Sequence, residues 1–187
     1  MNQMTQELNN FESYNWNGIG YGESYLRSLF DYVRAHPFKD GLEVGFDVGG
    51  SALAFLRGCT EARLLSIDIA LCGEGNARLR TSDVTDRFSF RCCDSRVDMV
   101  EMVSQYGEKC FDFIYIDGDH LFDVALQDLR NADKLLMDGG YMIVDDADIN
   151  HQHFGVGRAV DQFCNENNYQ KSDLGNSPSH AVILRRK

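Results

Sequence analysis

The sequence predicts an α/β fold, a doubly wound and mostly parallel sheet with helices on both faces. Short apolar segments of strand length alternate with longer segments in which apolar residues recur at helical spacing. Acidic residues follow these apolar segments and do not interrupt them, as expected for strands that end at one functional edge. With 187 residues, of which 43% are hydrophobic and 25% charged, the chain is long enough to bury such a core.

The first half of the chain begins with a helix at residues 22–36, whose apolar residues share one face and which stops before Pro37. A serine at its start and a glycine at its end mark a second helix at 51–58. Residues 71–83 are ambiguous, since loop and helix both fit them. The strands expected in this half are 41–46, 63–69 and 87–93.

The second half begins with a helix at 95–107, for which Ser95 is a candidate cap. A strand at 111–117 precedes a long amphipathic helix at 121–140 that is expected to end at Gly139. The remaining elements are a strand at 141–146, a helix at 155–168 and a terminal antiparallel pair, 169–174 with 180–187.

Residues 21–187 are expected to form a single domain, preceded by a segment, 1–20, that is either flexible or a lid. Trp16 in this segment either covers the substrate or packs the first helix against the sheet. The segment lacks the layout of a secretion signal and no apolar run is long enough to span a bilayer, so a cytoplasmic location is expected. The net charge of -11 argues against a nucleic-acid or anionic-membrane partner.

A glycine-rich turn follows the strand at 41–46. Gly45, Gly49 and Gly50 would let a ligand approach the backbone, and a helix beginning at Ser51 would offer free N–H groups. The spacing is not that of a dinucleotide site, and the lysine of a phosphate loop is missing, so a purely structural turn fits equally well.

Acids also end the next two strands. Asp68 occupies a place where a carboxylate commonly binds the two hydroxyls of a ribose, and its alternative role is a helix cap. Asp94 either caps the helix that follows or stands near an adenine ring, and the two roles are compatible.

The fourth and fifth strands end in denser polar clusters, and here the sequence resembles a known family. "FDFIYIDGDH" ends in Asp117, Asp119 and His120, and "GGYMIVDD" ends in Asp145 and Asp146. Together with the glycine turn, these motifs resemble the class I S-adenosylmethionine-dependent methyltransferases over roughly residues 41–163. The most similar branch includes antibiotic-sugar O-methyltransferases and cephalosporin-hydroxylase-type proteins.

The resemblance implies a Rossmann-like sheet of about seven strands, with the last strand antiparallel. It implies that S-adenosylmethionine is bound by Glu43, Gly45, Gly49, Gly50, Ser51, Asp68, Asp94 and Asp117. In the metal-dependent sugar methyltransferases, acids matching Asp117, Asp145 and Asp146 bind magnesium, and the acid matching Asp119 is the proposed base. Asp47 departs from the family pattern, which often has glycine there, and its carboxylate is free to face the amino or sulfonium group of the cofactor.

A cation at this edge of the sheet is also expected from the charges of the acids. Three carboxylates that converge repel one another unless they are protonated or bind a cation. Oxygen ligands suit Mg²⁺, Ca²⁺ or Mn²⁺, whereas His120, His151 and His153 would favour a transition metal. A divalent ion would lower the pKa of a substrate hydroxyl, and Asp119 or His120 would remove its proton.

The sequence therefore predicts an O-methyltransferase that acts on a sugar or another small hydroxylated molecule, with a homodimer as one way to complete the pocket. A metal-dependent phosphohydrolase using Asp117 and Asp119 is one alternative, although such an Asp pair normally follows the first strand. A non-catalytic domain that binds a cofactor or a partner is another alternative. A nicotinamide enzyme is disfavoured by the glycine spacing.

Overall fold

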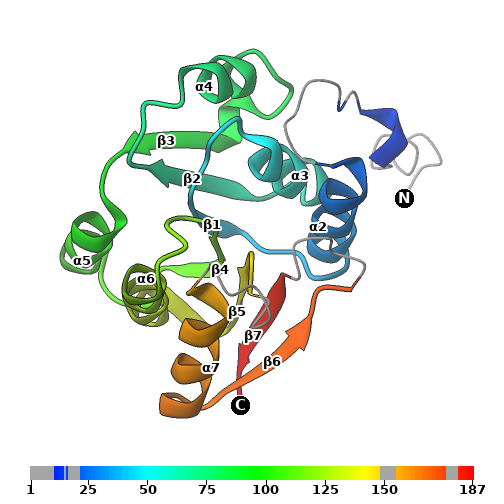
Figure 1. Ribbon diagram of the computed structural model, residues 1–187. Helices are drawn as coiled ribbons and strands as arrows, with labels where there is room; N and C mark the ends of the chain where they lie inside the picture. Colours follow the sequence, from blue (N-terminus) through cyan, green and yellow to red (C-terminus); the bar gives the residue numbers. More distant parts are fainter. Residues whose placement is uncertain (1–10, 15, 17–21, 148–154, 176–180) are drawn as a thin grey trace.

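The computed structural model describes residues 11–14, 16, 22–147, 155–175 and 181–187. In these residues, seven strands form one sheet in the order β3-β2-β1-β4-β5-β7-β6 (Figure 1). Strand β7 alone runs opposite to the other six strands, which confirms the predicted fold class. The strands are β1 (Asp40–Val44), β2 (Arg63–Asp68), β3 (Phe88–Cys92), β4 (Phe111–Ile116), β5 (Leu136–Val144), β6 (Tyr169–Asp173) and β7 (Val182–Arg186).

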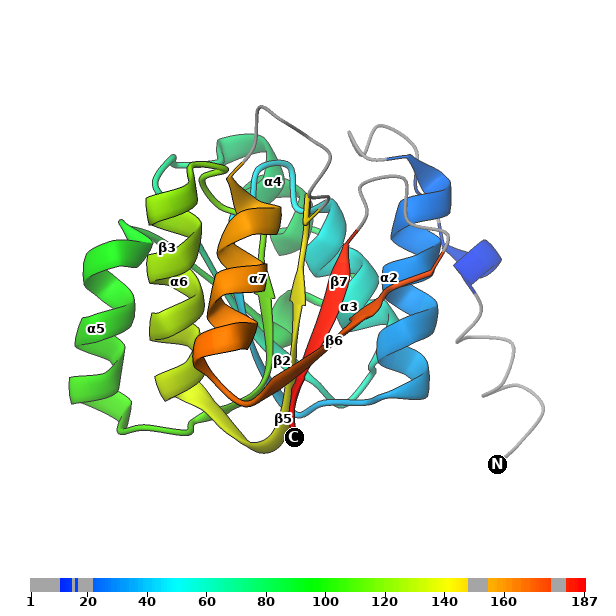
Figure 2. The ribbon, with the colours of Figure 1, turned by 60° about the horizontal axis from the view of Figure 1, so that its bottom comes forward.

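Helices cover both faces of the sheet. Figure 2 shows α5, α6 and α7 on one face, with α2 and α3 on the other. No helix in the described part of the chain is long and apolar enough to cross a bilayer. The helices are α2 (Glu23–Ala35), α3 (Gly50–Gly58), α4 (Gly73–Arg80), α5 (Ser95–Tyr106), α6 (Phe122–Leu135) and α7 (Val156–Glu166), with short 3₁₀ turns η1 (Phe11–Ser13) and η2 (Thr85–Arg87).

The sheet is buried on both sides, and β4 shows how one strand supplies two cores. Phe113 and Tyr115 belong to the apolar cluster beneath α2 and α3. Ile114 and Ile116 belong to the cluster beneath α5, α6 and α7. Because successive side chains of a strand point to opposite faces, a nearly continuous apolar run is what a central parallel strand requires.

One prediction about a helix end is wrong. The helix expected to reach Gly139 ends at Leu135, and the "LMDGG" that follows begins β5. Leu136 pairs with Phe111 of β4, and the register shifts between Phe111 and Phe113 while Gly139 takes a φ of +84°. A bulge with a left-handed glycine therefore lets residues 136–140 join the sheet, although their apolar pattern continues that of the preceding helix.

Ser95 and Ser51 are not helix caps, contrary to the prediction. Asp94 caps α5 by accepting a hydrogen bond from the Arg96 backbone N–H, and Gly49 occupies the cap position of α3. The serine hydroxyls instead donate to buried carboxylates described below. The ambiguous segment 71–83 contains α4, and the terminal antiparallel pair is confirmed.

Trp16 is part of a cluster at the outer side of α2. Its ring stacks on Phe11 at 4.4 Å between centroids, and its indole N–H donates to the Phe11 carbonyl at 2.8 Å. Phe11 is buried and meets Phe30 of α2 edge to face. Trp16 therefore packs onto α2, which fits the packing alternative in part, since the described part of the chain places its ring against Phe11 and Phe30 and not against an aromatic ring of the sheet. The division of the chain at residue 20, with a flexible or lid segment before it, stays a prediction.

Candidate active site

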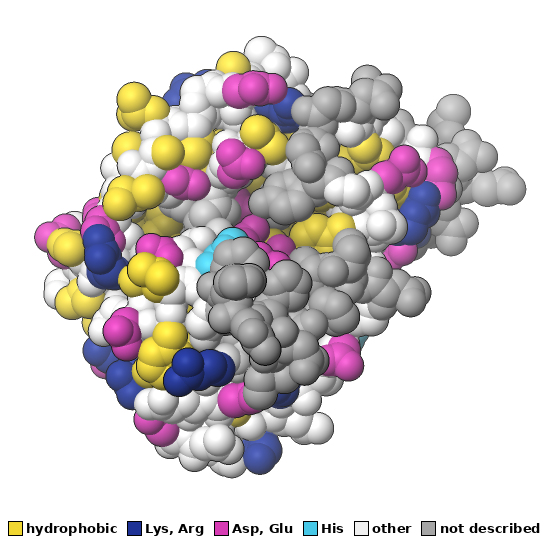
Figure 3. Space-filling model, viewed as in Figure 1, with side chains coloured by type: hydrophobic (Ala, Val, Ile, Leu, Met, Phe, Trp, Pro, Cys, Tyr) yellow, Lys and Arg dark blue, Asp and Glu magenta, His cyan; other side chains and the backbone are white. Residues whose placement is uncertain are grey.

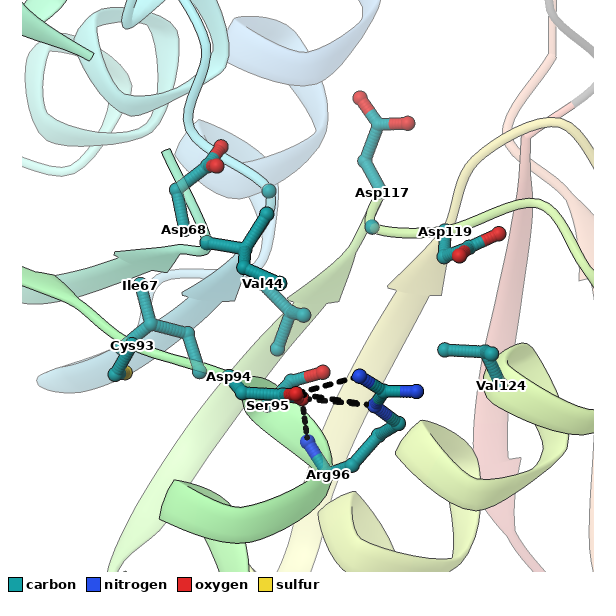
Figure 4. Close-up of a pocket in the computed structure, with 13 residues that line it drawn as sticks. Val44, Ile67, Asp68, Cys93, Asp94, Ser95, Arg96, Asp117, Asp119 and Val124 are labelled. Carbon is teal, nitrogen blue, oxygen red and sulfur yellow. Dashed lines mark hydrogen bonds and ion pairs between the residues drawn. The ribbon is translucent and has the colours of Figure 1, made fainter. Parts of the chain in front are cut away.

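A cavity of about 330 Å³ opens at the carboxyl ends of the central strands (Figure 4). It lies where the strand order reverses between β1 and β4, the place at which open parallel sheets bind ligands. Its wall includes five residues that the sequence predicted as site residues: Gly45, Asp68, Asp94, Asp117 and Asp119. In Figure 4, Asp68, Asp94 and Asp117 stand around the cavity at the ends of three different strands, and the Asp94 carboxylate points toward Arg96.

Gly45 lets the ends of β1 and β4 meet beside this cavity. Its φ is +89°, and an added Cβ would lie 1.9 Å from the carbonyl oxygen of Asp117. The Asp117 N–H donates to the Val44 carbonyl at 2.8 Å, so the two strands remain hydrogen-bonded up to this point. No residue with a side chain fits here, so the backbone packing alone requires glycine at position 45.

Glu43 is buried beneath the glycine turn, with 0% of its surface exposed. The hydroxyls of Ser51 and Ser66 donate to its two carboxyl oxygens, so it connects β1 with α3 and β2. Burial raises the pKa of Glu43 to about 8, although the two serine hydrogen bonds oppose the shift. Glu43, Gly49, Gly50 and Ser51 lie outside the cavity wall, and their contact with a cofactor stays a prediction.

Asp68 holds the glycine turn against β2. Its Oδ2 accepts hydrogen bonds from the backbone N–H groups of Phe46 at 2.8 Å and Asp47 at 3.2 Å, and its Oδ1 accepts from Ala70 at 2.8 Å. Partial burial acts to raise the pKa of Asp68, but these donors outweigh it and hold the pKa below its ordinary value. Asp47 has a φ of +44°, a left-handed conformation in which glycine is favoured, and this agrees with the glycine that the resemblance led us to expect there.

Asp94 forms an ion pair with Arg96 at the side of the cavity. The Arg96 guanidinium donates to both carboxyl oxygens, with the shortest contact at 2.6 Å, and the Arg96 backbone N–H adds a further bond at 3.0 Å (Figure 4). The Arg96 side-chain hydrogen bond is the main reason why the pKa of Asp94 is lowered. Sequence reasoning did not identify Arg96, which also lines the cavity.

An acid–histidine cluster, formed by Asp117, His120 and Asp146, lies next to the cavity. One ligand atom of each residue lies within 4.8 Å of the others. The His120 Nε2 is 3.5 Å from Asp117 Oδ1 and 3.3 Å from Asp146 Oδ2, and Asp146 has a left-handed φ of +50°. The hydrogen bond with Asp117 and the charge of Asp146 raise the pKa of His120, although burial opposes them. In Figure 3, a histidine lies beside acidic side chains near the middle of this face.

Asp145 faces inward, unlike its neighbour Asp146. It is buried, its Oδ2 accepts a hydrogen bond from the Tyr115 hydroxyl at 3.0 Å, and its Oδ1 accepts from the Asp146 N–H. The Tyr115 hydroxyl also lies 3.3 Å from Asp117 and 2.9 Å from the hydroxyl of Tyr25 on α2. Sequence reasoning did not identify Tyr115 as a residue of this site. A tyrosine in place of phenylalanine in a buried strand was the available signal, since a buried hydroxyl needs a partner.

Asp119 is exposed and accepts a hydrogen bond from the Leu121 N–H at 2.9 Å, which turns the chain into α6. It lines the cavity, whereas His120 belongs to the acid–histidine cluster. The two candidate bases therefore stand at adjacent positions of one loop. His151 and His153 lie outside the described residues.

The sequence and fold of the chain are similar to those of known methyltransferases. A family model described as a methyltransferase domain matches residues 42–147, more than half of the chain. The chain belongs to this methyltransferase family. The match includes the glycine turn, Asp68, Asp94 and the acids after β4 and β5. No curated protein sequence matches the chain.

Solved methyltransferase structures share the fold over nearly the whole chain. An O-methyltransferase from Bacillus cereus in complex with SAH is 17% identical, with 97% of this chain and 88% of that chain covered and a TM-score of 0.71. A SAH-bound methyltransferase from Podospora anserina is 17% identical, with coverages of 100% and 97% and a TM-score of 0.68. The O-methyltransferase TomG from Streptomyces achromogenes, in complex with SAM, is 17% identical, with coverages of 98% and 89% and a TM-score of 0.67.

The family match and the shared fold confirm the resemblance to class I S-adenosylmethionine-dependent methyltransferases. They do not favour the alternative of a metal-dependent phosphohydrolase. The sugar substrate and the metal stay predictions.

Proposed function

We propose that the protein transfers a methyl group from S-adenosylmethionine to a hydroxyl group of a small molecule. The observation that carries this proposal is the juxtaposition of two features. A cavity with Asp68 and Asp94 on its wall adjoins the acid–histidine cluster, in a chain of the methyltransferase family. Similarly folded O-methyltransferases from Bacillus cereus and Streptomyces achromogenes are complexes with SAH and SAM.

The residues of the cavity suit S-adenosylmethionine, which supplies a methyl group on a positively charged sulfur when bound. Four acids, Asp68, Asp94, Asp117 and Asp119, line the wall, and Arg96 offsets only Asp94, so the field in the cavity stays negative and favours a cationic ligand. Gly45 carries no side chain that would fill the space between β1 and β4. We assign Asp68 to the ribose and the Asp94 end of the cavity to the adenine.

The acid–histidine cluster is the proposed acceptor site. Asp119 or His120 takes the proton that the substrate hydroxyl releases. Asp117 and Asp146 offer carboxylate oxygens to a divalent cation such as Mg²⁺, with Asp145 as the further predicted ligand and His120 as the nearby nitrogen. Such a cation lowers the pKa of a bound hydroxyl. A sugar is the proposed acceptor within this class.

Calorimetric titration tests the cofactor assignment. The wild-type protein is expected to bind S-adenosylhomocysteine, and Asp68→Ala is expected to weaken binding by about tenfold, because a buried hydrogen bond to the ligand is lost. The exposed Asp123 of α6 offers a matched control in Asp123→Ala, which should bind normally. A wild-type protein that binds NADH or a sugar phosphate but neither SAM nor SAH at millimolar concentration contradicts the proposal.

A screen of hydroxylated acceptors with and without Mg²⁺ then tests the chemistry. If Asp119 is the base, Asp119→Asn retains cofactor binding and loses turnover. If His120 is the base, His120→Ala loses turnover while Asp119→Asn keeps it. Activity that is retained in both variants and after EDTA treatment would exclude the proposed acceptor site.

Three further parts of the proposal are independent of the chemistry. Residues 21–187 are proposed to be a single methyltransferase domain with 1–20 as a flexible or lid segment, which limited proteolysis with and without SAH tests. A homodimer is proposed to complete the pocket, and light scattering measures its mass. The cytoplasmic location is proposed on the sequence alone, and cell fractionation tests it.

A further inference from the structure

Asp128 is a buried carboxyl group beneath the cavity that the proposed chemistry does not use. It lies on α6 with 1% of its surface exposed. Its Oδ1 accepts a hydrogen bond from the Ser95 hydroxyl at 2.7 Å, whereas its Oδ2 has no hydrogen-bond partner among the described residues. This Oδ2 lies 3.4 Å from the position of a Cβ on Gly118, a residue of the cavity wall.

A half-satisfied carboxyl group at such a place is costly to stability. Burying a polar atom without a partner costs about 1–3 kcal/mol, and an apolar side chain of similar shape avoids that cost. Packing between α5 and α6 therefore gives no reason for an acid at position 128. The acid instead acts on its partner Ser95, which stands on the cavity wall at the first turn of α5.

Asp128 decides which way the Ser95 hydroxyl can bond. An ionised carboxylate only accepts hydrogen bonds, so the Ser95 proton is committed to Asp128 and the serine oxygen can only accept from a ligand. Burial raises the pKa of Asp128 to about 6, which leaves it ionised at pH 8. The Ser95 hydroxyl therefore offers a ligand an acceptor and no donor.

The neighbouring acid, Asp94, has its acceptor oxygens already engaged. Both oxygens of Asp94 already accept from Arg96, through its guanidinium and its backbone N–H. Asp94 and Ser95 are adjacent at the start of α5, so both stand at the end of the cavity that we assign to the base of the cofactor. With Asp94 occupied, the serine oxygen is a side-chain acceptor that a ligand donor can reach there.

We propose that Asp128, acting through Ser95, makes this end of the cavity select a base that presents an amino group over one that presents a carbonyl group. The inference rests on the proposed function, which places the adenine of S-adenosylmethionine at this end. The exocyclic amine of adenine donates to the serine oxygen. The carbonyl of hypoxanthine would instead set two acceptors against each other. Asp128 is a positioning residue, since it acts on the ligand through Ser95.

Titration calorimetry at pH 8 with two ligands tests this selection. S-adenosyl-L-homocysteine and S-inosyl-L-homocysteine differ in the amino or carbonyl group of the base. The wild-type protein is expected to prefer the adenosyl ligand by about tenfold or more, the effect of one gained and one mismatched hydrogen bond. Ser95→Ala and Asp128→Leu are expected to reduce this preference to about two- to threefold.

Stability separates this role from a structural one. Asp128→Leu is expected to retain or raise the melting temperature, because it removes a buried unsatisfied oxygen. Asp128→Ala also removes the acceptor and serves as the second variant if the leucine disturbs folding. Ser104→Ala and Asp123→Asn, at exposed positions on α5 and α6, are the matched controls and should keep the wild-type preference.

The outcomes are distinct. Undiminished preference in Ser95→Ala and in both Asp128 variants, with adenosyl ligand still bound, overturns the inference and leaves the proposed function intact. A wild-type protein that binds neither ligand overturns the proposed function, and the inference fails with it. Loss of preference in the Ser95 and Asp128 variants, with folding retained, supports the inference.

Discussion

Replacing Glu43 with glutamine is expected to change how stability depends on pH. Glu43 is fully buried between Ser51 and Ser66, and its pKa is raised to about 8 from an ordinary value of 4.5. The folded protein therefore holds a proton on Glu43 at neutral pH that the unfolded chain releases. Glutamine keeps the shape and neutrality of that protonated acid, and it cannot ionise.

The sign and size follow from linkage. Because the folded pKa lies above the unfolded value, the contribution of Glu43 to stability is complete below pH 4.5 and is lost as pH rises through 8. Between pH 5 and pH 8, this group alone lowers the free energy of unfolding by about 3 kcal/mol. Other titrating groups add their own dependence, but they are common to the wild type and Glu43→Gln.

Urea unfolding of both proteins at pH 5 and pH 8 measures the difference. Relative to Glu43→Gln, the wild type is expected to lose about 3 kcal/mol over this range. Glu101→Gln, at an exposed position of α5, is the control and should follow the wild type. Parallel pH profiles for the wild type and Glu43→Gln would refute the reasoning. Titration of Glu43→Gln with S-adenosylhomocysteine tests the predicted cofactor role as well: weaker binding would support contact between Glu43 and the cofactor, and unchanged binding would argue against it.

Three further predictions concern the meeting point of β1, β4 and β5. Gly45→Ala is expected to cost more than about 2 kcal/mol of stability, because its Cβ would lie 1.9 Å from the Asp117 carbonyl oxygen at a φ of +89°; wild-type stability in urea would contradict this. Tyr115→Phe is expected to cost about 1–3 kcal/mol, because buried Asp145 loses a donor, and an unchanged urea midpoint would argue against it. Mg²⁺ or Mn²⁺ is expected to raise the wild-type melting temperature, and Asp117→Asn should lose that shift whereas exposed Asp123→Asn keeps it; a melting temperature insensitive to both ions and to EDTA would remove the metal site.

Most of the fold was predictable because its signals are local. Apolar runs of strand length, helical periodicity and glycine stops lie within a few residues of one another, and they predicted the alternation of strands and helices as well as the terminal antiparallel pair. The boundary after Leu135 was not predictable in this way. Leucines occupy both sides of it, and the pairing of Leu136 with Phe111, far away in sequence, ends the helix there.

The composition of the site was only partly predictable. Sequence reasoning placed Asp117, Asp119 and His120 at one end of a strand, and Asp145 and Asp146 at the end of its neighbour. It could not decide which of these side chains would meet. Asp146 turns toward His120 in a left-handed conformation, while adjacent Asp145 turns inward to Tyr115.

The sequence by itself determined which residue types arrive at the carboxyl edge of the sheet, since each acid directly follows its own strand. Only the tertiary structure decided the partners. Ser95 bonds to Asp128 across two helices, and Glu43 is enclosed by serines from a helix and a neighbouring strand. Such pairs depend on packing between segments distant in the chain and on the direction in which each side chain leaves its backbone, and neither is recorded in local sequence pattern.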